Sequence, residues 1–446
     1  MNVLIIPSWY PGKSDSLLGV YHKDYAKALS KYENVNMLFI NKYGLSYIFK
    51  YLFIKNKVIV NESGYKTYIY KMLDLSKISK KLELIRYRKV LDRAYKDYIK
   101  SETIPDIIHA EVTLPAGYGS SCIGKKYNIP VLVTEHSSNY YQYFKGINKE
   151  FGDYVINNSY YSTVSNYMKN ELNLNKCYVI PNIVDTSVFN KKKYKRGKTL
   201  RLICIAGFRN GKNLDDIIKV IDNLVNKKKM DVHLDMVGDG YLMPYLNELV
   251  DSLNLRKYIS FKGCIKDKNE IAKLLASSDI YLVASDIETF CIPGVEALAS
   301  GTPVVSSRCK GTSEYVDSKC GEFFNCHDID DFSDAIIRVS KKLDSYDINY
   351  LKNISKSIAI ITKDDSEAEK IYNSLKDDFD IMLLGGYGHI KRDLVVVPSY
   401  TAKGLEFDSV IIYNDIDNKY TKEDKYLYYV ACTRAQHNLI IYNGGE

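Results

Sequence analysis

The stretch that decides the fold runs from Ile287 to Val305 and has the sequence Ile-Glu-Thr-Phe-Cys-Ile-Pro-Gly-Val-Glu-Ala-Leu-Ala-Ser-Gly-Thr-Pro-Val-Val. Pro293 predicts the first turn of a helix, because proline has no N–H to leave unpaired and its φ is already near the helical value. Gly301 suits the end of that helix, and Pro303 stops it before an apolar run typical of a buried strand.

Two carboxylates flank the start of this helix. Glu288 lies on the loop that enters it, and Glu296 lies within about its first turn. The backbone N–H groups from about Phe290 to Val295 are free to bind a ligand, and a helix N-terminus favours an anion there. The stretch predicts a phosphate site with an acid on each side, which suits the hydroxyls of a sugar nucleotide. Taken alone, the two acids are more typical of helix capping, since acids favour helix starts.

Length and composition indicate an ordinary multidomain protein. The 446 residues are enough for two or three domains, and 46% are hydrophobic while 26% are charged. No apolar run approaches the roughly 20 residues that span a bilayer. The short apolar start of the chain, ended by Pro7, does not have the pattern of a signal peptide. We therefore expect a cytoplasmic location.

The nine cysteines are scattered without a Cys-x-x-Cys pair. Cys320, Cys326 and His327 come nearest to a metal-binding cluster, but the sequence offers no evident fourth ligand. Reduced thiols in or near the core are the better interpretation, and no metal site is expected.

Part of the net charge of +8 lies in two segments that mix basic and apolar residues, Tyr47–Lys55 and Lys77–Arg93. They are compatible with binding to an anionic membrane surface. They are equally compatible with surface helices whose apolar sides enter the core. Aromatic residues next to lysines between Tyr47 and Lys55 slightly favour the membrane.

Apolar runs alternate with helical patterns from the N-terminus, and the alternation restarts after a basic stretch at 191–198. This pattern predicts an α/β protein with two doubly wound, Rossmann-like domains, at residues 1–170 and 171–353, facing each other across a cleft. After about Ser355 the chain changes character and predicts a small third α/β unit, residues 354–446. In such sheets the ligand sites lie at the carboxyl ends of the strands.

Residues 1 to about 350 resemble the family-4 retaining glycosyltransferases of the GT-B fold. Glu288 and Glu296, with seven residues between them, match that family's two glutamates, and Ala297–Val305 matches the helix and return strand that follow. Further similar segments are Val179–Phe189, Met236–Gly240 and Phe261–Ile265. The N-terminal Pro7–Pro11, with Gly19-Val20-Tyr21, resembles a loop of enzymes that assemble capsule and other surface polysaccharides.

The resemblance implies a donor site in the second domain. Lys212 matches a lysine that neutralises the leaving diphosphate, and such a cation is what a departing diphosphate needs. The companion arginine normally follows the glycine directly, but Phe208 stands there and Arg209 comes one residue later. Glu296 would bind the ribose hydroxyls. The other implied donor-binding residues are Gly19, where the backbone could approach the phosphates without a Cβ, and Phe290, Cys291 and Ile292.

Catalysis is assigned by resemblance to His136, near the sugar and the acceptor, and to Glu288, at the hydroxyls of the transferred sugar. His109 ends a neighbouring strand and is expected to support the site. No well-placed nucleophile is evident, which favours same-face transfer assisted by the leaving phosphate. The first Asp-x-Asp, Asp328-Ile329-Asp330, lies beyond the donor motifs. We therefore expect no metal and no cofactor.

These features lead to a functional expectation. The chain is expected to be a retaining, metal-independent hexosyltransferase that takes a UDP- or GDP-sugar as donor. The expected acceptor is a surface polysaccharide or a lipid-linked glycan. The expected location is the cytoplasm, which is compatible with peripheral contact at the inner face of the plasma membrane.

Residues from about 356 onward resemble the second RecA-like domain of superfamily 1, UvrD-like DNA helicases. Pro398–Asp408, with Lys403, Gly404 and Glu406, is similar to helicase motif V, and Tyr429–Ala435 to motif VI. The resemblance implies that Arg434 reaches a γ-phosphate.

A complete helicase is not encoded, however. The nearest match to a P-loop is Gly197-Lys198-Thr199, with Lys192 in place of the first glycine, and no Asp-Glu pair occurs. Autonomous helicase activity and DNA binding are not expected. Two alternatives stay open: a nucleic-acid-associated or ATPase-partner protein whose front part only binds sugar nucleotides, and a glycosyltransferase with an inert appended domain.

Overall fold

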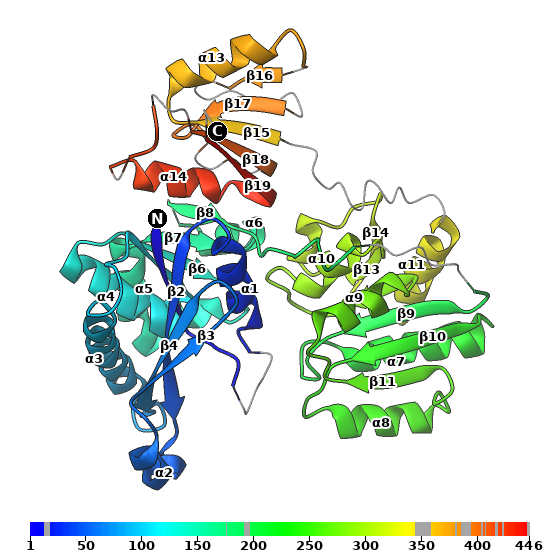
Figure 1. Ribbon diagram of the computed structural model, residues 1–446. Coiled ribbons are helices and arrows are strands. Elements are labelled where there is room, and N and C mark those ends of the chain that lie inside the picture. Colours follow the sequence, from blue (N-terminus) through cyan, green and yellow to red (C-terminus); the bar gives the residue numbers. More distant parts are fainter. Residues whose placement is uncertain are drawn as a thin grey trace. The chain divides into compact units, whose positions relative to one another are not determined.

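The computed structural model describes the chain except for residues 13–17, 175, 191–196, 344–357, 380, 385–393, 403–404, 406, 415–417, 422 and 444–446. The described residues form three sheets flanked by helices, as the α/β prediction required (Figure 1). Contacts group residues 1–182 with the segment that carries helix α14 (Lys425–Cys432), and the second and third sheets fall in the other group.

The first sheet has the strand order β3-β4-β2-β1-β5-β6-β7-β8 and is parallel except for the β3–β4 pair. Its strands are β1 (Asn2–Pro7), β2 (Asn34–Tyr43), β3 (Lys57–Asn61), β4 (Lys66–Leu73), β5 (Ile107–Glu111), β6 (Val131–Glu135), β7 (Tyr160–Thr163) and β8 (Cys177–Val179). Its helices are α1 (Val20–Leu29), α2 (Ile48–Phe53), α3 (Lys80–Tyr98), α4 (Tyr118–Tyr127), α5 (Lys149–Asn158) and α6 (Asn166–Leu172).

Both faces of the first sheet are covered, which is why β1 is an unbroken apolar run. Leu4 and Ile6 face a cluster that includes side chains of α3, α4 and α5. Val3 and Ile5 face the opposite side, where Ala26 of α1 packs.

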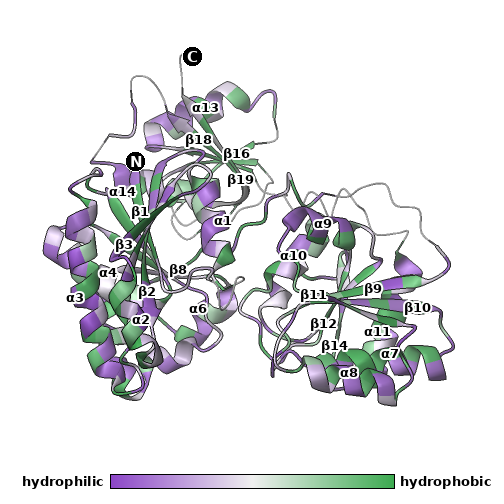
Figure 2. Ribbon diagram, turned by 60° about the horizontal axis from the view of Figure 1, so that its bottom comes forward, coloured by the Kyte–Doolittle hydropathy of each residue, from purple (hydrophilic) through white to green (hydrophobic). Residues whose placement is uncertain are grey.

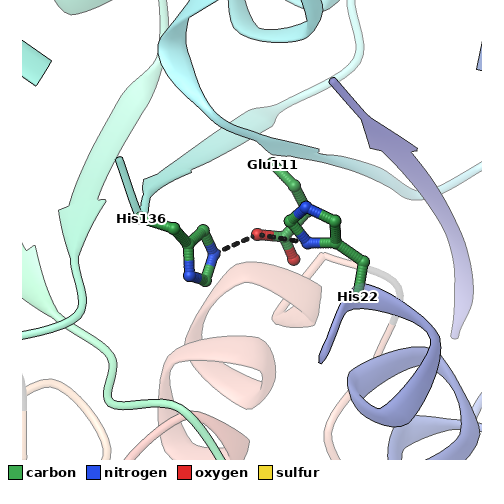
Figure 3. A group of neighbouring side chains, drawn as sticks. All are labelled: His22, Glu111 and His136. Carbon is green, nitrogen blue, oxygen red and sulfur yellow. Dashed lines mark hydrogen bonds and ion pairs between the residues drawn. The ribbon is translucent and has the colours of Figure 1, made fainter. Parts of the chain in front are cut away.

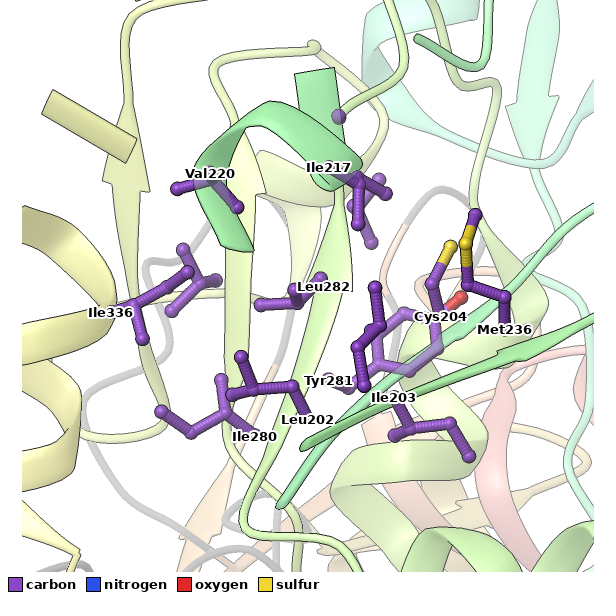
Figure 4. Packing of buried hydrophobic residues seen from close by; sticks show 14 of the residues in the cluster. Leu202, Ile203, Cys204, Ile217, Val220, Met236, Ile280, Tyr281, Leu282 and Ile336 are labelled. Carbon is purple, nitrogen blue, oxygen red and sulfur yellow. The ribbon is translucent and has the colours of Figure 1, made fainter. Parts of the chain in front are cut away.

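The second sheet is wholly parallel, with the order β11-β10-β9-β12-β13-β14. Its strands are β9 (Leu200–Ile205), β10 (Val232–Val237), β11 (Ile259–Gly263), β12 (Ile280–Val283), β13 (Val304–Ser307) and β14 (Gly321–Phe324), and its helices are α7 (Leu214–Asp222), α8 (Met243–Ser252), α9 (Lys268–Ala276), α10 (Ile292–Ala299) and α11 (Ile329–Lys342). Figure 4 shows its core, where Ile217 and Val220 of α7 approach the central strands β9 and β12.

The third sheet is parallel, with the order β16-β17-β15-β18-β19. Its elements are β15 (Ile358–Thr362), α13 (Asp365–Leu375), β16 (Ile381–Leu383), β17 (Leu394–Pro398), β18 (Phe407–Asn414), α14 and β19 (Ala435–Asn443). Short helical turns elsewhere are η1 (Leu45–Tyr47), η2 (Thr113–Gly117), η3 (Tyr140–Phe144), η4 (Gly146–Asn148), η5 (Asn223–Lys227) and η6 (Thr312–Glu314).

The two segments that mix basic and apolar residues differ in how much of their apolar surface is buried. Helix α3 alternates polar and apolar residues (Figure 2) and buries Leu84, Tyr87 and Leu91, so the core interpretation holds for 77–93. Helix α2 buries no side chain, and Phe49 and Phe53 are 80% and 90% exposed. The core interpretation is therefore wrong for α2. In the part of the chain that is described, no helix combines the length and apolarity needed to cross a membrane.

The strand orders of the first two sheets each reverse at one point, and α/β sheets form a ligand-binding crevice at such a point. In the first sheet β1 lies between β2 and β5, and in the second β9 lies between β10 and β12. The chain winds outward in opposite directions from each of these points, and the loops at the carboxyl ends of the two strands separate there. Ligands bind at such points in α/β sheets, so the β1/β5 and β9/β12 ends are where functional side chains should gather.

Candidate functional site

Lys212 and Glu288 meet at the β9/β12 crevice of the second domain. The loop after β9 carries Lys212, the loop after β12 carries Glu288, and Lys212 Nζ lies 2.5 Å from Glu288 Oε1. The hydroxyl of Ser285 donates to the same oxygen at 2.7 Å. Burial by itself lowers the pKa of Lys212, but Glu288 raises it above its usual range. The site thus holds a permanent ammonium group in a largely buried place.

Helix α10 starts beside this pair, as the sequence predicted from Pro293. Its N-cap, Cys291, has a φ of 67°, and its carbonyl accepts a hydrogen bond from the Tyr315 hydroxyl at 3.0 Å. A Cβ at Gly294 would lie 2.3 Å from that hydroxyl oxygen, so a side chain there would force the Tyr315 ring to move. Burial raises the pKa of the Cys291 thiol, which stays protonated and is no nucleophile.

The two glutamates occupy different environments. Glu288 is bonded to Lys212, whereas Glu296 lies inside α10, with Lys268 Nζ 4.0 Å from its Oε1. The N-cap of α10 is Cys291, whose side chain forms no capping hydrogen bond. Phe290 is buried against the ring of Tyr315, and Ile292 is the first residue of α10.

The loop after β9 shows why Arg209 comes one residue later than the arginine that the family resemblance leads us to expect. Phe208 is fully buried, with its ring centroid 6.1 Å from that of Phe261. Arg209 is exposed, and its Nε lies 3.9 Å from where a Cβ of Gly207 would be. The phenylalanine belongs to the core, so the guanidinium reaches the surface one residue later, beside the glycine.

A second cluster lies at the β1/β5 crevice of the first domain. Glu111 ends β5, His136 follows β6, and His136 Nε2 lies 2.6 Å from Glu111 Oε2 (Figure 3). His22 of α1 points at the same carboxylate, with Nδ1 3.7 Å from Oε2. The ring of Tyr21 stands 4.9 Å from that of His136 and 4.0 Å from that of His22.

Burial and charge act in opposite directions on this cluster. Burial alone raises the pKa of Glu111, but His109, His136 and His22 around it lower the pKa to about 2. Burial lowers the pKa of His22 from 6.5 to about 3 and also lowers that of His109. At pH 7 the cluster is thus an ionised carboxylate between neutral buried histidines, hydrogen-bonded to a less buried one, His136.

His109 and Glu135 surround the pair. His109 Nε2 lies 3.6 Å from Glu111 Oε1 and 2.7 Å from the hydroxyl oxygen of Thr134. Glu135 is fully buried and accepts hydrogen bonds from the backbone N–H groups of Thr113 and His136 at 2.9 and 3.0 Å. Glu135 therefore fixes the backbone on which His136 stands.

The backbone of Trp9 leaves no room for a side chain at Gly19. Gly19 is the N-cap of α1 with a φ of 77°, and a Cβ there would lie 2.6 Å from the carbonyl oxygen of Trp9. The close neighbour of Gly19 is thus the Trp9–Tyr10 backbone. The predicted contact with phosphates would have to come from the N–H groups at the start of α1.

Comparison with known proteins identifies parts of the chain. Residues 185–356 match the family described as glycosyl transferases group 1, and residues 391–443 match the UvrD-like helicase C-terminal domain. The chain contains a group 1 glycosyltransferase domain.

Relatives extend the likeness. An uncharacterized glycosyltransferase of Methanocaldococcus jannaschii is 30% identical over 227 residues, which are 50% of this chain and 61% of the relative. Protein CapJ of Staphylococcus aureus is 26% identical over 283 residues, 60% of this chain and 70% of CapJ. The structure of Anabaena HepE in complex with UDP aligns with 84% of this chain and all of that protein, at a TM-score of 0.59 and 14% identity. The chain thus spans about three fifths of the first relative, and its architecture is that of GT-B glycosyltransferases.

The motif VI arginine of the helicase-like segment is buried. Arg434 is 2% exposed, and its Nη1 donates to the carbonyl of Leu405 at 3.1 Å. Its own carbonyl accepts from the N–H of Phe407 at 3.0 Å. The other motif residues, Lys403, Gly404 and Glu406, lie outside the described residues.

Part of the cluster at the β1/β5 crevice was not evident from the sequence. Glu111, His22 and Glu135 were not predicted, although Glu111 ends a strand two residues after His109 and Glu135 directly precedes His136. The three residues that came nearest to a metal-binding cluster in the sequence do not all lie together. Cys320 lies apart, 3.3 Å from the carbonyl of Tyr315, whereas the ligand atoms of Cys326 and His327 lie within 4.8 Å of Asp286.

Proposed function

We propose that the chain is a retaining, metal-independent glycosyltransferase that moves a sugar from a UDP- or GDP-sugar to a surface polysaccharide or lipid-linked acceptor. The observation that carries the proposal is the pairing of Lys212 and Glu288 at the β9/β12 crevice, beside the N-terminus of α10. A sheet switch point, a buried cation and a helix N-terminus together suit a diphosphate.

On the donor side each side chain has a distinct task. Lys212, with Arg209 at the surface, would neutralise the charge that the leaving diphosphate gains as the glycosidic bond breaks. The backbone N–H groups near Phe290, Cys291 and Ile292 would bind phosphate oxygens. Glu296 would accept hydrogen bonds from ribose hydroxyls and Glu288 from hydroxyls of the sugar.

On the acceptor side, His136 would contact the reacting hydroxyl. Its hydrogen bond to the ionised Glu111 orients the ring. With the Cys291 thiol protonated and no nucleophile assigned at the donor site, we favour attack on the same face that the diphosphate leaves, with a phosphate oxygen assisting removal of the proton.

Exposed aromatic residues on α2 support peripheral contact with an anionic membrane. Phe49, Leu52 and Phe53 are 80%, 72% and 90% exposed, and Lys50 and Lys55 lie among them. Such a surface suits the lipid interface, where aromatic rings insert and lysines meet anionic headgroups. A lipid-linked acceptor would be presented at that interface.

The rival proposal, an ATPase-partner or nucleic-acid-associated protein, rests on Arg434. The burial of Arg434 and its hydrogen bond to the Leu405 carbonyl count against this rival, because an arginine finger must extend to a phosphate.

The reaction itself tests the proposal. Each UDP- and GDP-hexose is incubated with the chain in excess EDTA, and the released sugar is followed by proton NMR before it mutarotates. We expect one donor to be hydrolysed slowly with its anomeric configuration retained, and Glu288→Gln to abolish this. Inverted product, or turnover only with added divalent metal, would contradict the mechanism.

A further inference from the structure

Helix α14 overlaps the motif VI segment of the helicase-like region, and its side chains contact the first domain. Tyr429 is 4% exposed and belongs to the cluster formed by Val3, Ile5 and Ile107 of the first sheet. These side chains are one face of β1 and β5, which must be covered because parallel sheets are buried on both sides.

The contact is specific as well as apolar. The Tyr429 hydroxyl lies 3.2 Å from His109 Nδ1, and the two rings meet edge to face at 6.4 Å. His109 is 1% exposed, and its other nitrogen is held by the Thr134 hydroxyl at 2.7 Å. Both ring nitrogens are thus engaged, one of them by a residue more than 300 positions away.

Two further contacts lie on the same side of α14. The ring of Tyr426 lies 4.6 Å from that of Tyr160 at the start of β7. Lys425 Nζ lies 4.0 Å from the carboxylate of Asp106, just before β5. Residues 426 and 429 are three apart and therefore share one helix face.

We propose that α14 is a structural part of the first domain: it covers the β1/β5 face of the sheet and, through Tyr429, positions the His109 ring beside Glu111. Helix α14 then completes the domain that carries His136. This inference does not depend on the proposed transfer activity.

Zero-length cross-linking of the intact wild-type chain tests the placement. A carbodiimide should join Lys425 to Asp106 as an amide, detectable by peptide mass spectrometry and absent in Asp106→Asn. Lys126 and Asp92, 2.7 Å apart within the first domain, provide the positive control. A link between Lys126 and Asp92 without one between Lys425 and Asp106 would overturn the proposal.

Hydrogen exchange tests the consequence. In Tyr426→Ala/Tyr429→Ala, the amides of β1 and α1 should exchange about tenfold faster or more, while those of β9 and β12 stay unchanged. Tyr442→Ala, at an exposed tyrosine of β19, is the control and should change neither. Wild-type exchange in β1 and α1 of the double variant would overturn the proposal.

Should the double variant fail to fold, Tyr429→Phe removes only the hydroxyl. It should shift the ring ¹⁵N resonances of His109 with β1 exchange kept at the wild-type rate. Unshifted resonances would show that Tyr429 does not position His109.

Discussion

At the scale of single residues, both candidate sites are built from charges that are only partly accessible to water. Lys212 and Glu288 have side chains 18% and 13% exposed, and Glu111 is 2% exposed. Such groups stay ionised only beside a partner, so each pair must be considered as a unit.

The Lys212–Glu288 pair makes a first prediction. Glu288→Gln leaves the ammonium without its counter-charge and should destabilise the second domain by about 2 kcal/mol. The double variant Lys212→Met/Glu288→Gln should recover at least half of that loss, since no unpaired charge remains. Hydrogen exchange of β9 and β12 measures both, and a double variant less stable than the single one would contradict the explanation.

His22 makes a second prediction, on pH. Its folded pKa of about 3 lies below the 6.5 of the unfolded chain, so the unfolded state binds more protons between these values. First-domain stability should therefore fall as the pH drops below 6.5, by up to about 1.4 kcal/mol per pH unit for this one group. His109, also lowered, adds to the same slope.

Trp9, the single tryptophan of the chain, reports on this region, with its ring 6.3 Å from His22. Urea unfolding followed by its fluorescence at pH 7, 6 and 5 gives the slope. His22→Gln should reduce the slope, whereas His233→Gln, in the second domain, should not. An unchanged slope in His22→Gln would rule out the buried, neutral state of this histidine.

At the scale of elements, α2 and α14 show how differently aromatic residues on a helix can be used. Both carry aromatic residues among polar ones, but α2 leaves them in solvent and α14 buries Tyr429. Amphipathic patterns show that a face must be covered and do not show by what.

Helix α2 makes a third prediction. Phe49→Ser/Phe53→Ser should weaken binding to vesicles rich in anionic lipid by about tenfold or more, because two exposed rings no longer enter the interface. Co-sedimentation measures this binding, with Ile104→Ser, 60% exposed elsewhere on the first domain, as control. Equal binding of wild type and the double variant would exclude α2 as the contact.

At the scale of the whole molecule, the sequence predicted the three sheets because apolar runs alternate with helical patterns in each. It predicted Lys212 and Glu288 because both stand in recognisable local motifs. It did not predict Glu111 with His22, or Tyr429 with His109, since these pairs join distant segments through tertiary packing that no local pattern records.

The contacts of α14 give a fourth prediction, about the chain as a whole. If the helicase-like region were inert, a chain ending at Leu343 would keep the stability of the first domain. We expect instead that the shortened chain has a less stable first domain. The loss of the buried Tyr429 side chain by itself accounts for about 3 kcal/mol. The Trp9 unfolding curve of the shortened chain measures this, and a midpoint equal to that of the full chain would contradict it.

The central claim is that the β9/β12 crevice binds a sugar nucleotide, and calorimetry without added metal tests it most directly. UDP, GDP and ATP are titrated into the full chain, into Glu296→Ala and into Glu248→Ala, an exposed glutamate of α8. We predict binding of UDP or GDP that Glu296→Ala loses and Glu248→Ala keeps. Binding of ATP alone, or UDP and GDP binding unaffected by Glu296→Ala, would contradict the assignment of Lys212, Glu288 and Glu296 to the donor.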